Sequence, residues 1–125
     1  MFDGADAGDL MPWAAVIVLG VVLTGAGVLL VVVGSRAAAG RLPRNWIVGI
    51  RTTKTLESAA AWQAAHHAAA GSFSVAGYVA VMGGLALFTR PSNIVGLGLV
   101  VLVLLVMLAA ALIGAYRGFR AIDDL

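Results

Sequence analysis

Side chains suited to molecular recognition are concentrated in one stretch of this sequence, between Arg41 and Gly71. Guanidinium, indole, imidazole and hydroxyl groups occur there together, whereas the long segments on either side are uncharged. The Arg51 guanidinium is a planar donor that suits a lipid phosphate, a carboxylate or a cluster of backbone carbonyls. Trp62 and His66 are four residues apart, a spacing that places them on one side of a helix. We therefore expect this stretch to contain the recognition site of the protein.

Two of these side chains have more than one candidate role. Arg51 either binds an anionic ligand or partner at the inner face of a membrane, or ties its own loop to helix ends or to headgroups. Trp62 either stacks on a ligand or anchors the chain at the level of the headgroups. Gly49 permits a close approach of the backbone or an unusual φ, so we expect it to help fix the Arg51 guanidinium in one place.

Several kinds of chemistry have no support in the sequence. The chain has no cysteine, which excludes disulfides, thiolate zinc sites and cysteine nucleophiles. His66 and His67 are adjacent and point about 100° apart on a helix, which does not suit a shared metal, and Glu57 is the carboxylate nearest to them. The sequence contains no recognisable Ser-His-Asp set, no paired carboxylates and no Gly-rich phosphate loop. We therefore expect no enzymatic activity and no bound metal or cofactor.

Composition places the chain among integral membrane proteins. Hydrophobic residues make up 62% of its 125 residues, charged residues make up 11%, and the mean hydropathy is +1.02. Three uncharged runs, at about residues 12–34, 72–89 and 94–116, have lengths suited to crossing a hydrocarbon core of about 30 Å as helices. The sequence predicts an all-α membrane protein with three transmembrane helices, forming a single membrane domain over residues 1–125.

Residues 35–71 separate the first two spans and are too polar to cross the membrane. We expect a cytoplasmic loop there, followed by an additional amphipathic helix at the membrane interface. Thr55 is the predicted N-cap of this helix, with Glu57 close to its positive end. The helix should begin at Thr55 or Leu56, continue toward Gly71 and remain outside the hydrocarbon core.

Small residues recur at helical intervals in all three spans. The first span has Gly20, Gly27 and Gly34, the second has Ala76, Ala80 and Gly84, and the third has Ala110, Gly114 and Gly118. Helices approach one another closely where side chains are small, so these residues predict packing faces. The faces serve either the three helices of one chain or association with another protein, including a second copy of this chain.

Basic residues predict the orientation in the cell membrane. Five Lys and Arg lie in residues 35–71 and two follow the third span, whereas the second loop has only Arg90 and the acidic N-terminus has none. Under the positive-inside rule, the central stretch and the C-terminus face the cytoplasm and the N-terminus lies outside. Because the basic residues flank hydrophobic spans, we expect the lipid bilayer to be their partner, and no nucleic acid.

The central stretch resembles the signature of the SdpI family of small bacterial integral membrane proteins. The resemblance rests on Asn45, Gly49-Ile50-Arg51-Thr52, Thr55-Leu56, Trp62 and His66, which precede a run of small residues and a membrane helix. Together with Trp46, these motif residues are the candidates for binding a partner or lipid. The family is named for a protein that protects producing cells from a secreted sporulation-delaying toxin and helps to hold a repressor at the membrane.

The resemblance implies an immunity or signalling factor that binds a peptide or protein partner at the membrane. The alternative is a small accessory subunit of a larger membrane complex, such as a transporter or an envelope enzyme, attached through its glycine and alanine faces. The sequence does not choose between these two functions.

Overall fold

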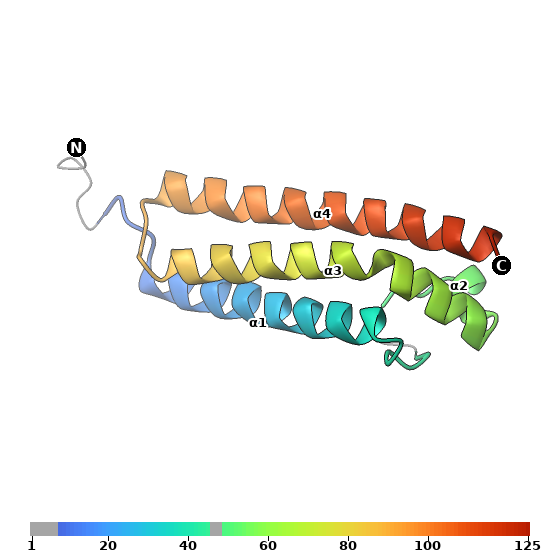
Figure 1. The fold of residues 1–125 in the computed structure, drawn as a ribbon. Coiled ribbons are helices and arrows are strands. Elements are labelled where there is room, and N and C mark those ends of the chain that lie inside the picture. Colours follow the sequence, from blue (N-terminus) through green and yellow to red (C-terminus); the bar gives the residue numbers. More distant parts are fainter. Residues whose placement is uncertain (1–7, 46–48) are drawn as a thin grey trace.

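The structure is a computed structural model and describes residues 8–45 and 49–125. Within these ranges the chain forms four helices: α1 (Trp13–Ala38), α2 (Thr53–Leu56), α3 (Ala59–Leu87) and α4 (Asn93–Asp123) (Figure 1). The predicted all-α class is confirmed, and a short additional helix lies between the first two long ones. The helices α1, α3 and α4 are each long and apolar enough to cross a membrane, which identifies a multi-pass membrane protein.

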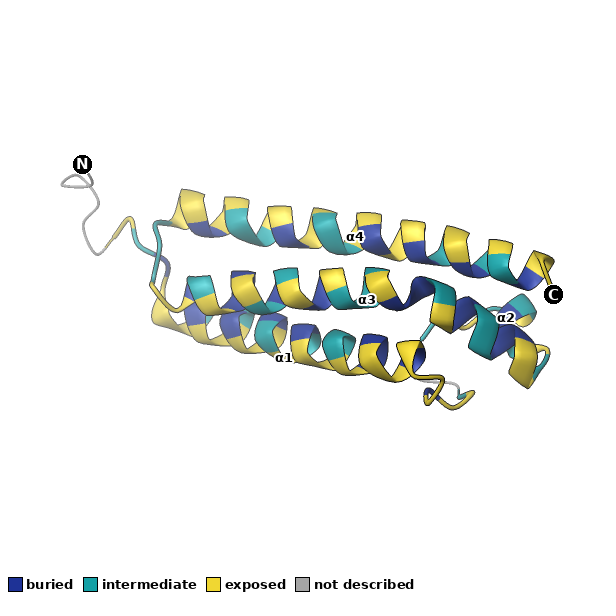
Figure 2. Cartoon of the chain, in the orientation of Figure 1, coloured by how far each residue is buried: buried dark blue, intermediate teal, exposed yellow. Residues whose placement is uncertain are grey.

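The three long helices lie side by side with α3 in the middle (Figure 1). Both α1 and α4 pack along α3, whereas the described backbones of α1 and α4 do not approach each other closely. Buried residues follow the faces turned toward neighbouring helices, and exposed residues follow the outer faces (Figure 2). Exposed side chains such as Ile17, Val21, Leu105 and Leu112 are large and apolar, so this outer surface suits lipid rather than water.

Glycines bring α1 and α3 into backbone contact. A Cβ atom on Gly27 would lie 2.6 Å from the carbonyl oxygen of Gly77, and one on Gly77 would lie 2.7 Å from that of Gly27. Seven residues further along α1, a Cβ on Gly34 would lie 3.0 Å from the Ala70 carbonyl oxygen. The prediction that Gly20, Gly27 and Gly34 form a packing face is confirmed, since all three are buried.

The small residues of the other two spans also pack within the chain. The Cβ position of Gly114 lies 3.1 Å from the Ser72 Cβ, and that of Gly118 lies 3.1 Å from the Ala65 carbonyl oxygen, so α4 approaches α3 at these two glycines. The remaining members of the predicted faces are buried as well: Ala76, Ala80, Gly84 and Ala110. All three faces therefore contribute to packing between helices of one chain.

The helix that contains the second predicted span begins well before that span. Helix α3 is continuous from Ala59 to Leu87 and does not break at Gly71, so most of the segment predicted as a separate interfacial helix is the first part of α3. The alanine-rich run before Gly71 favours helix and contains no proline to end it. At about 1.5 Å per residue, its 29 residues extend about 43 Å, longer than a hydrocarbon core of about 30 Å. A helix of this length can cross the core and still leave its polar first turns outside it.

The helix starts also differ from the prediction. Thr52 caps α2, because its Oγ1 accepts the Thr55 N–H at 3.2 Å while the Thr55 Oγ1 accepts the Thr52 N–H at 2.9 Å. Ser58 has an extended backbone, and its hydroxyl caps α3 by accepting the Ala61 N–H at 3.0 Å. The prediction of an N-cap at Thr55 is wrong, because two other hydroxyl residues flank Thr55 and each begins a helix of its own.

At the other end of the helix layer, the segment before α1 is attached to the turn between α3 and α4. The Met11 N–H donates to the Pro91 carbonyl oxygen at 2.9 Å, and the Arg90 Nε donates to the Met11 carbonyl oxygen at 2.9 Å. The Arg90 guanidinium also lies 4.8 Å from the centre of the Trp13 ring. The start of α1 therefore shares one end of the layer with this turn, whereas α2 and the C-terminus lie at the opposite end (Figure 1).

Candidate functional site

His66 holds the loop of residues 49–52, called here the motif loop, against α3. The His66 ring is fully buried, and its Nε2 lies 2.8 Å from the backbone nitrogen of Ile50. Because an amide N–H can only donate, Nε2 accepts, which places the ring proton on Nδ1, 2.8 Å from the Trp62 carbonyl oxygen. Both ring nitrogens are thus engaged within the chain, and the neutral imidazole connects the loop to the helix.

Thr55 holds the same loop residue from the other side. Its side chain is fully buried, and its hydroxyl donates to the Ile50 carbonyl oxygen at 2.7 Å. The Ile50 N–H is bound by His66, so two side chains of the motif satisfy both backbone polar groups of this residue. Buried backbone groups need such partners, and the loop obtains them without joining a helix or a strand. The position of Ile50 is therefore fixed by one side chain five residues away and another 16 residues away in the sequence.

Trp62 completes the attachment beneath the loop. Its side chain is fully buried, its ring stacks on the His66 ring with centroids 3.9 Å apart, and its Nε1 donates to the Leu42 carbonyl oxygen at 2.8 Å. The structure thus shows Trp62 in a third role, as a packing residue inside the protein, rather than as a ligand stack or a headgroup anchor. A buried indole whose N–H is hydrogen-bonded provides a rigid packing surface for the loop.

Gly49 allows the loop to lie close to the Trp62 and His66 rings. Its φ is +110°, a backbone conformation that residues with side chains rarely adopt. A Cβ atom there would lie 2.5 Å from the His66 Nε2 and 3.2 Å from the Trp62 ring. Both properties expected of Gly49 from the sequence, an unusual φ and a close backbone approach, are present.

The structure brings five of the predicted motif residues together and separates the others. His66 and Thr55 bind the backbone of Ile50, Thr52 pairs with Thr55, and Trp62 stacks on His66 behind Gly49. Ile50 belongs to the motif, but the sequence does not indicate its central place in this arrangement. Arg51 follows Ile50 directly and is exposed. The Asn45 side chain donates to the Pro43 carbonyl oxygen at 2.8 Å, a local turn contact, and Trp46 lies outside the described residues. The motif is therefore largely an internal support that presents Arg51 at the surface.

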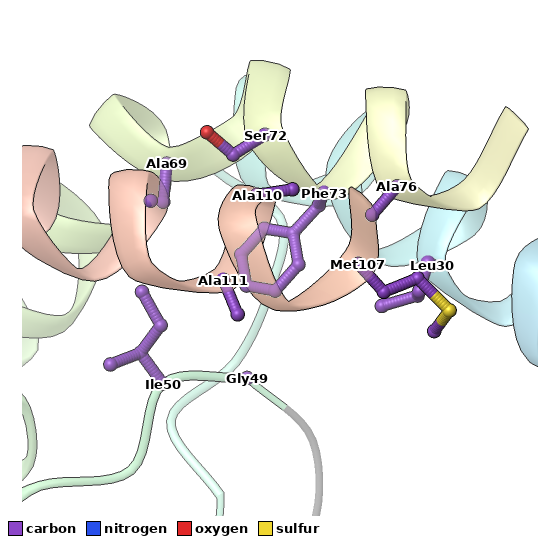
Figure 3. A pocket seen from close by; sticks show the side chains of 11 residues that line it. Leu30, Gly49, Ile50, Ala69, Ser72, Phe73, Ala76, Met107, Ala110 and Ala111 are labelled. Carbon is purple, nitrogen blue, oxygen red and sulfur yellow. The ribbon is translucent and has the colours of Figure 1, made fainter. Parts of the chain in front are cut away.

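A cavity of about 250 Å³ opens beside the motif loop (Figure 3). Figure 3 shows Gly49 and Ile50 on one side of it, with side chains from the three long helices around the remainder. The helices contribute Leu30, Ala69, Ser72, Phe73, Ala76, Met107, Ala110, Ala111 and Gly114. The sequence did not predict this cavity. Three of its lining residues, Ala76, Ala110 and Gly114, belong to the predicted packing faces of α3 and α4. The cavity lies where the backbones of α1 and α4, which both pack on α3, remain apart from each other.

The end of the protein that carries the motif loop is rich in basic residues. Residues 36–57 and 117–124 contain seven Lys and Arg and three Asp and Glu. Lys54 of α2 forms an exposed ion pair with Asp123 of α4, and Arg44 donates to the Leu56 carbonyl oxygen at 3.3 Å. An exposed pair of this kind contributes at most about 1 kcal/mol, so the main consequence of these charges is a positive potential around the motif loop.

Comparison with known proteins agrees with the resemblance seen in the motif. No curated protein and no solved structure matches the chain. A model of the SdpI/YfhL protein family matches residues 41–116, which include the motif loop, all of α3 and most of α4. The match covers more than half of the chain and contains the residues that support the loop, and the protein therefore belongs to the SdpI/YfhL family of membrane proteins.

Proposed function

We propose that this protein is an immunity or signalling factor that binds a peptide or protein partner at the membrane through the motif loop. The proposal rests on one observation: the backbone of the motif loop is held in a fixed position next to Arg51. Ile50 is held at both backbone groups by buried side chains, and the residue that follows it, Arg51, is exposed. A guanidinium on a fixed backbone loses less conformational freedom on binding than one on a mobile loop. The proposal includes no catalytic step.

The chemistry of Arg51 indicates what such a partner offers. Its planar fork binds a carboxylate or a cluster of backbone carbonyls with two parallel hydrogen bonds. An acidic side chain, a peptide C-terminus or the free carbonyls at a helix C-terminus supply these acceptors. The positive charge around the loop favours the same anionic or electron-rich groups. These preferences support a peptide or protein partner at the membrane surface.

The accessory-subunit alternative has less support from the structure. Its basis in the sequence was the set of small-residue faces, and these pack between helices of the same chain, as at Gly27 with Gly77 and at Gly118 with Ala65. The described outer faces carry large apolar side chains, which a lipid environment accommodates without a further protein. We therefore favour the immunity or signalling function.

We further propose that the motif loop and the C-terminus face the cytoplasm and that the N-terminus lies outside. The excess of basic residues at one end of the helix layer supports this orientation. Reporter fusions at Asp9, Lys54, Ser92 and Leu125 are expected to report outside, inside, outside and inside in that order. A cytoplasmic signal from the fusion at Asp9 or Ser92 would refute the orientation.

Arg51 variants test the proposed function. Cells that express the protein should be challenged with the secreted sporulation-delaying toxin against which the founding member of the family protects, and survival should be compared among variants. Arg51→Lys is expected to reduce protection nearly as much as Arg51→Ala, because a lysine keeps the charge and loses the fork. Loss of one charge-assisted contact corresponds to a decrease of about tenfold or more in partner affinity.

Matched variants separate this role from a general effect of charge. Arg41→Lys and Arg44→Lys should have mild effects on protection. The melting temperature of each variant in detergent should be measured beside its protection, so that a loss of binding is distinguished from a loss of stability. If lysine is tolerated equally at all three positions, Arg51 has no special role in binding. If the unmodified protein does not protect at all, immunity to this toxin is excluded.

A further inference from the structure

We propose that the cavity beside the motif loop holds an acyl chain of an anionic phospholipid from the membrane leaflet in which the loop lies. This inference concerns a ligand other than the proposed peptide or protein partner, although Arg51 borders both sites, and it does not depend on an immunity or signalling role. It rests on the lining of the cavity, on its position between membrane-spanning helices and on the charge of the adjoining surface.

The lining of the cavity suits a hydrocarbon chain. Aliphatic and aromatic side chains dominate it, including Leu30, Ile50, Phe73 and Met107, and Ser72 is the one polar side chain among the lining residues that the structure describes. Apolar cavities of about 150 Å³ already bind benzene and stay free of water, so a cavity of about 250 Å³ has room for a longer apolar group. If the cavity were empty, the side chains that line it would lack van der Waals contacts on one side.

The position of the cavity favours a lipid acyl chain over other apolar ligands. It lies among the membrane-spanning helices α1, α3 and α4, with Gly49 and Ile50 of the motif loop along one side. Ala111 lines the cavity and is exposed, so the cavity is open to the surroundings of the protein at that point. Around three membrane-spanning helices, those surroundings are acyl chains at very high local concentration. A flexible chain fills an irregular space between helices with little strain.

The positive charge of the adjoining surface favours a phospholipid with an anionic headgroup. Ile50 forms part of the cavity wall, and the next residue along the chain is the exposed Arg51. The same end of the protein has seven basic and three acidic residues, so a lipid held with its tail in the cavity has its headgroup in a positive potential. Phosphate groups bind guanidinium well, and a headgroup with net negative charge gains more than a zwitterionic one. The geometry thus points to an anionic lipid.

Native mass spectrometry of the intact protein tests this proposal. The protein should be released from nanodiscs that contain equal amounts of dioleoyl phosphatidylglycerol and dioleoyl phosphatidylcholine. We expect one retained lipid per protein, with phosphatidylglycerol favoured at least about fivefold. Ala111→Phe should reduce lipid retention by about tenfold, because the new ring occupies space that the acyl chain needs. Ala109→Phe is the matched control, since Ala109 is also exposed on α4 and does not line the cavity.

Each outcome either supports or overturns the proposal. Equal lipid retention by Ala111→Phe and Ala109→Phe would show that the lipid binds elsewhere on the surface. Equal retention of the two lipids would overturn the headgroup assignment, and a dimer without lipid would assign the cavity to a second copy of the chain. Circular dichroism should show unchanged helicity for both variants. If Ala111→Phe fails to fold, Ala111→Leu is used in its place, and unchanged lipid retention by that variant contradicts the proposal.

Discussion

A Gly27→Leu variant is expected to lose the packing of α1 on α3. The Cβ position of Gly27 lies 2.6 Å from both the Gly77 carbonyl oxygen and the Val81 backbone nitrogen, and backbone atoms cannot move aside as a flexible side chain can. The two helices would have to separate, and the cost is about 3 kcal/mol of unfolding free energy or more. Thermal melting in detergent, followed by circular dichroism and by retention of a monodisperse peak, should show this loss.

Gly25→Leu is the control for this effect. Gly25 lies two residues away in α1 and is exposed, and no heavy atom outside its own helix lies within 4 Å of its Cβ position. Leucine there should have no adverse effect and should favour the helix by about 1 kcal/mol relative to glycine. Similar destabilisation by the two variants would mean that α1 does not meet α3 at Gly27.

A Gly49→Ala variant is expected to release the motif loop from α3. Alanine must adopt a φ of +110°, and its methyl group would lie 2.5 Å from the His66 Nε2 that binds the Ile50 N–H. The strain of this backbone conformation and the loss of a buried hydrogen bond together cost about 2–4 kcal/mol. The expected result is a lower melting temperature together with faster amide hydrogen exchange at Ile50.

Gly40→Ala is the control that separates the backbone strain of a positive φ from the steric clash with His66 at position 49. Gly40 also has a positive φ, +71°, and no heavy atom beyond its two chain neighbours lies within 4 Å of its Cβ position. Alanine there should cost only the conformational strain, about 1–2 kcal/mol, and should leave hydrogen exchange at Ile50 unchanged. If both glycine variants leave the Ile50 amide equally protected, His66 does not hold the loop as the structure shows.

The spans and their packing faces were predictable because both follow from local sequence. Hydrophobic runs of sufficient length identify α1, α3 and α4, and glycines at intervals of seven identify the face of α1 that meets α3. The start of α3 was not predictable in the same way. Thr55 has the sequence context of an N-cap, and only the pairing of its hydroxyl with Thr52 and Ile50 shows that it lies inside α2. These contacts join Thr55 to residues three and five positions before it, so the geometry of the folded motif loop decides which hydroxyl residue caps the helix.

The candidate site was predictable in its residues and not in their arrangement. Trp62 and His66 have a helical spacing that indicates a shared face, but nothing local shows that this face receives the backbone of Ile50, 16 residues before His66. The cavity depends on which pairs of helices pack and which do not, a property of the whole layer. Ala111, which lines the cavity, cannot be distinguished in the sequence from Ala109, which does not.

Fluorescence of Trp62 alone tests most directly the central claim that the motif loop closes over α3 beside a cavity open to lipid. Trp13→Phe and Trp46→Phe would leave Trp62 as the single tryptophan, and this protein would be reconstituted into vesicles of phosphatidylglycerol. Trp62 is fully buried and lies directly behind Gly49, which lines the cavity. We predict that acrylamide in the water does not quench its emission, whereas bromine atoms on the lipid acyl chains do, and that Gly49→Ala admits acrylamide. Strong quenching by acrylamide without the Gly49 substitution, or no quenching by brominated chains, would contradict this account.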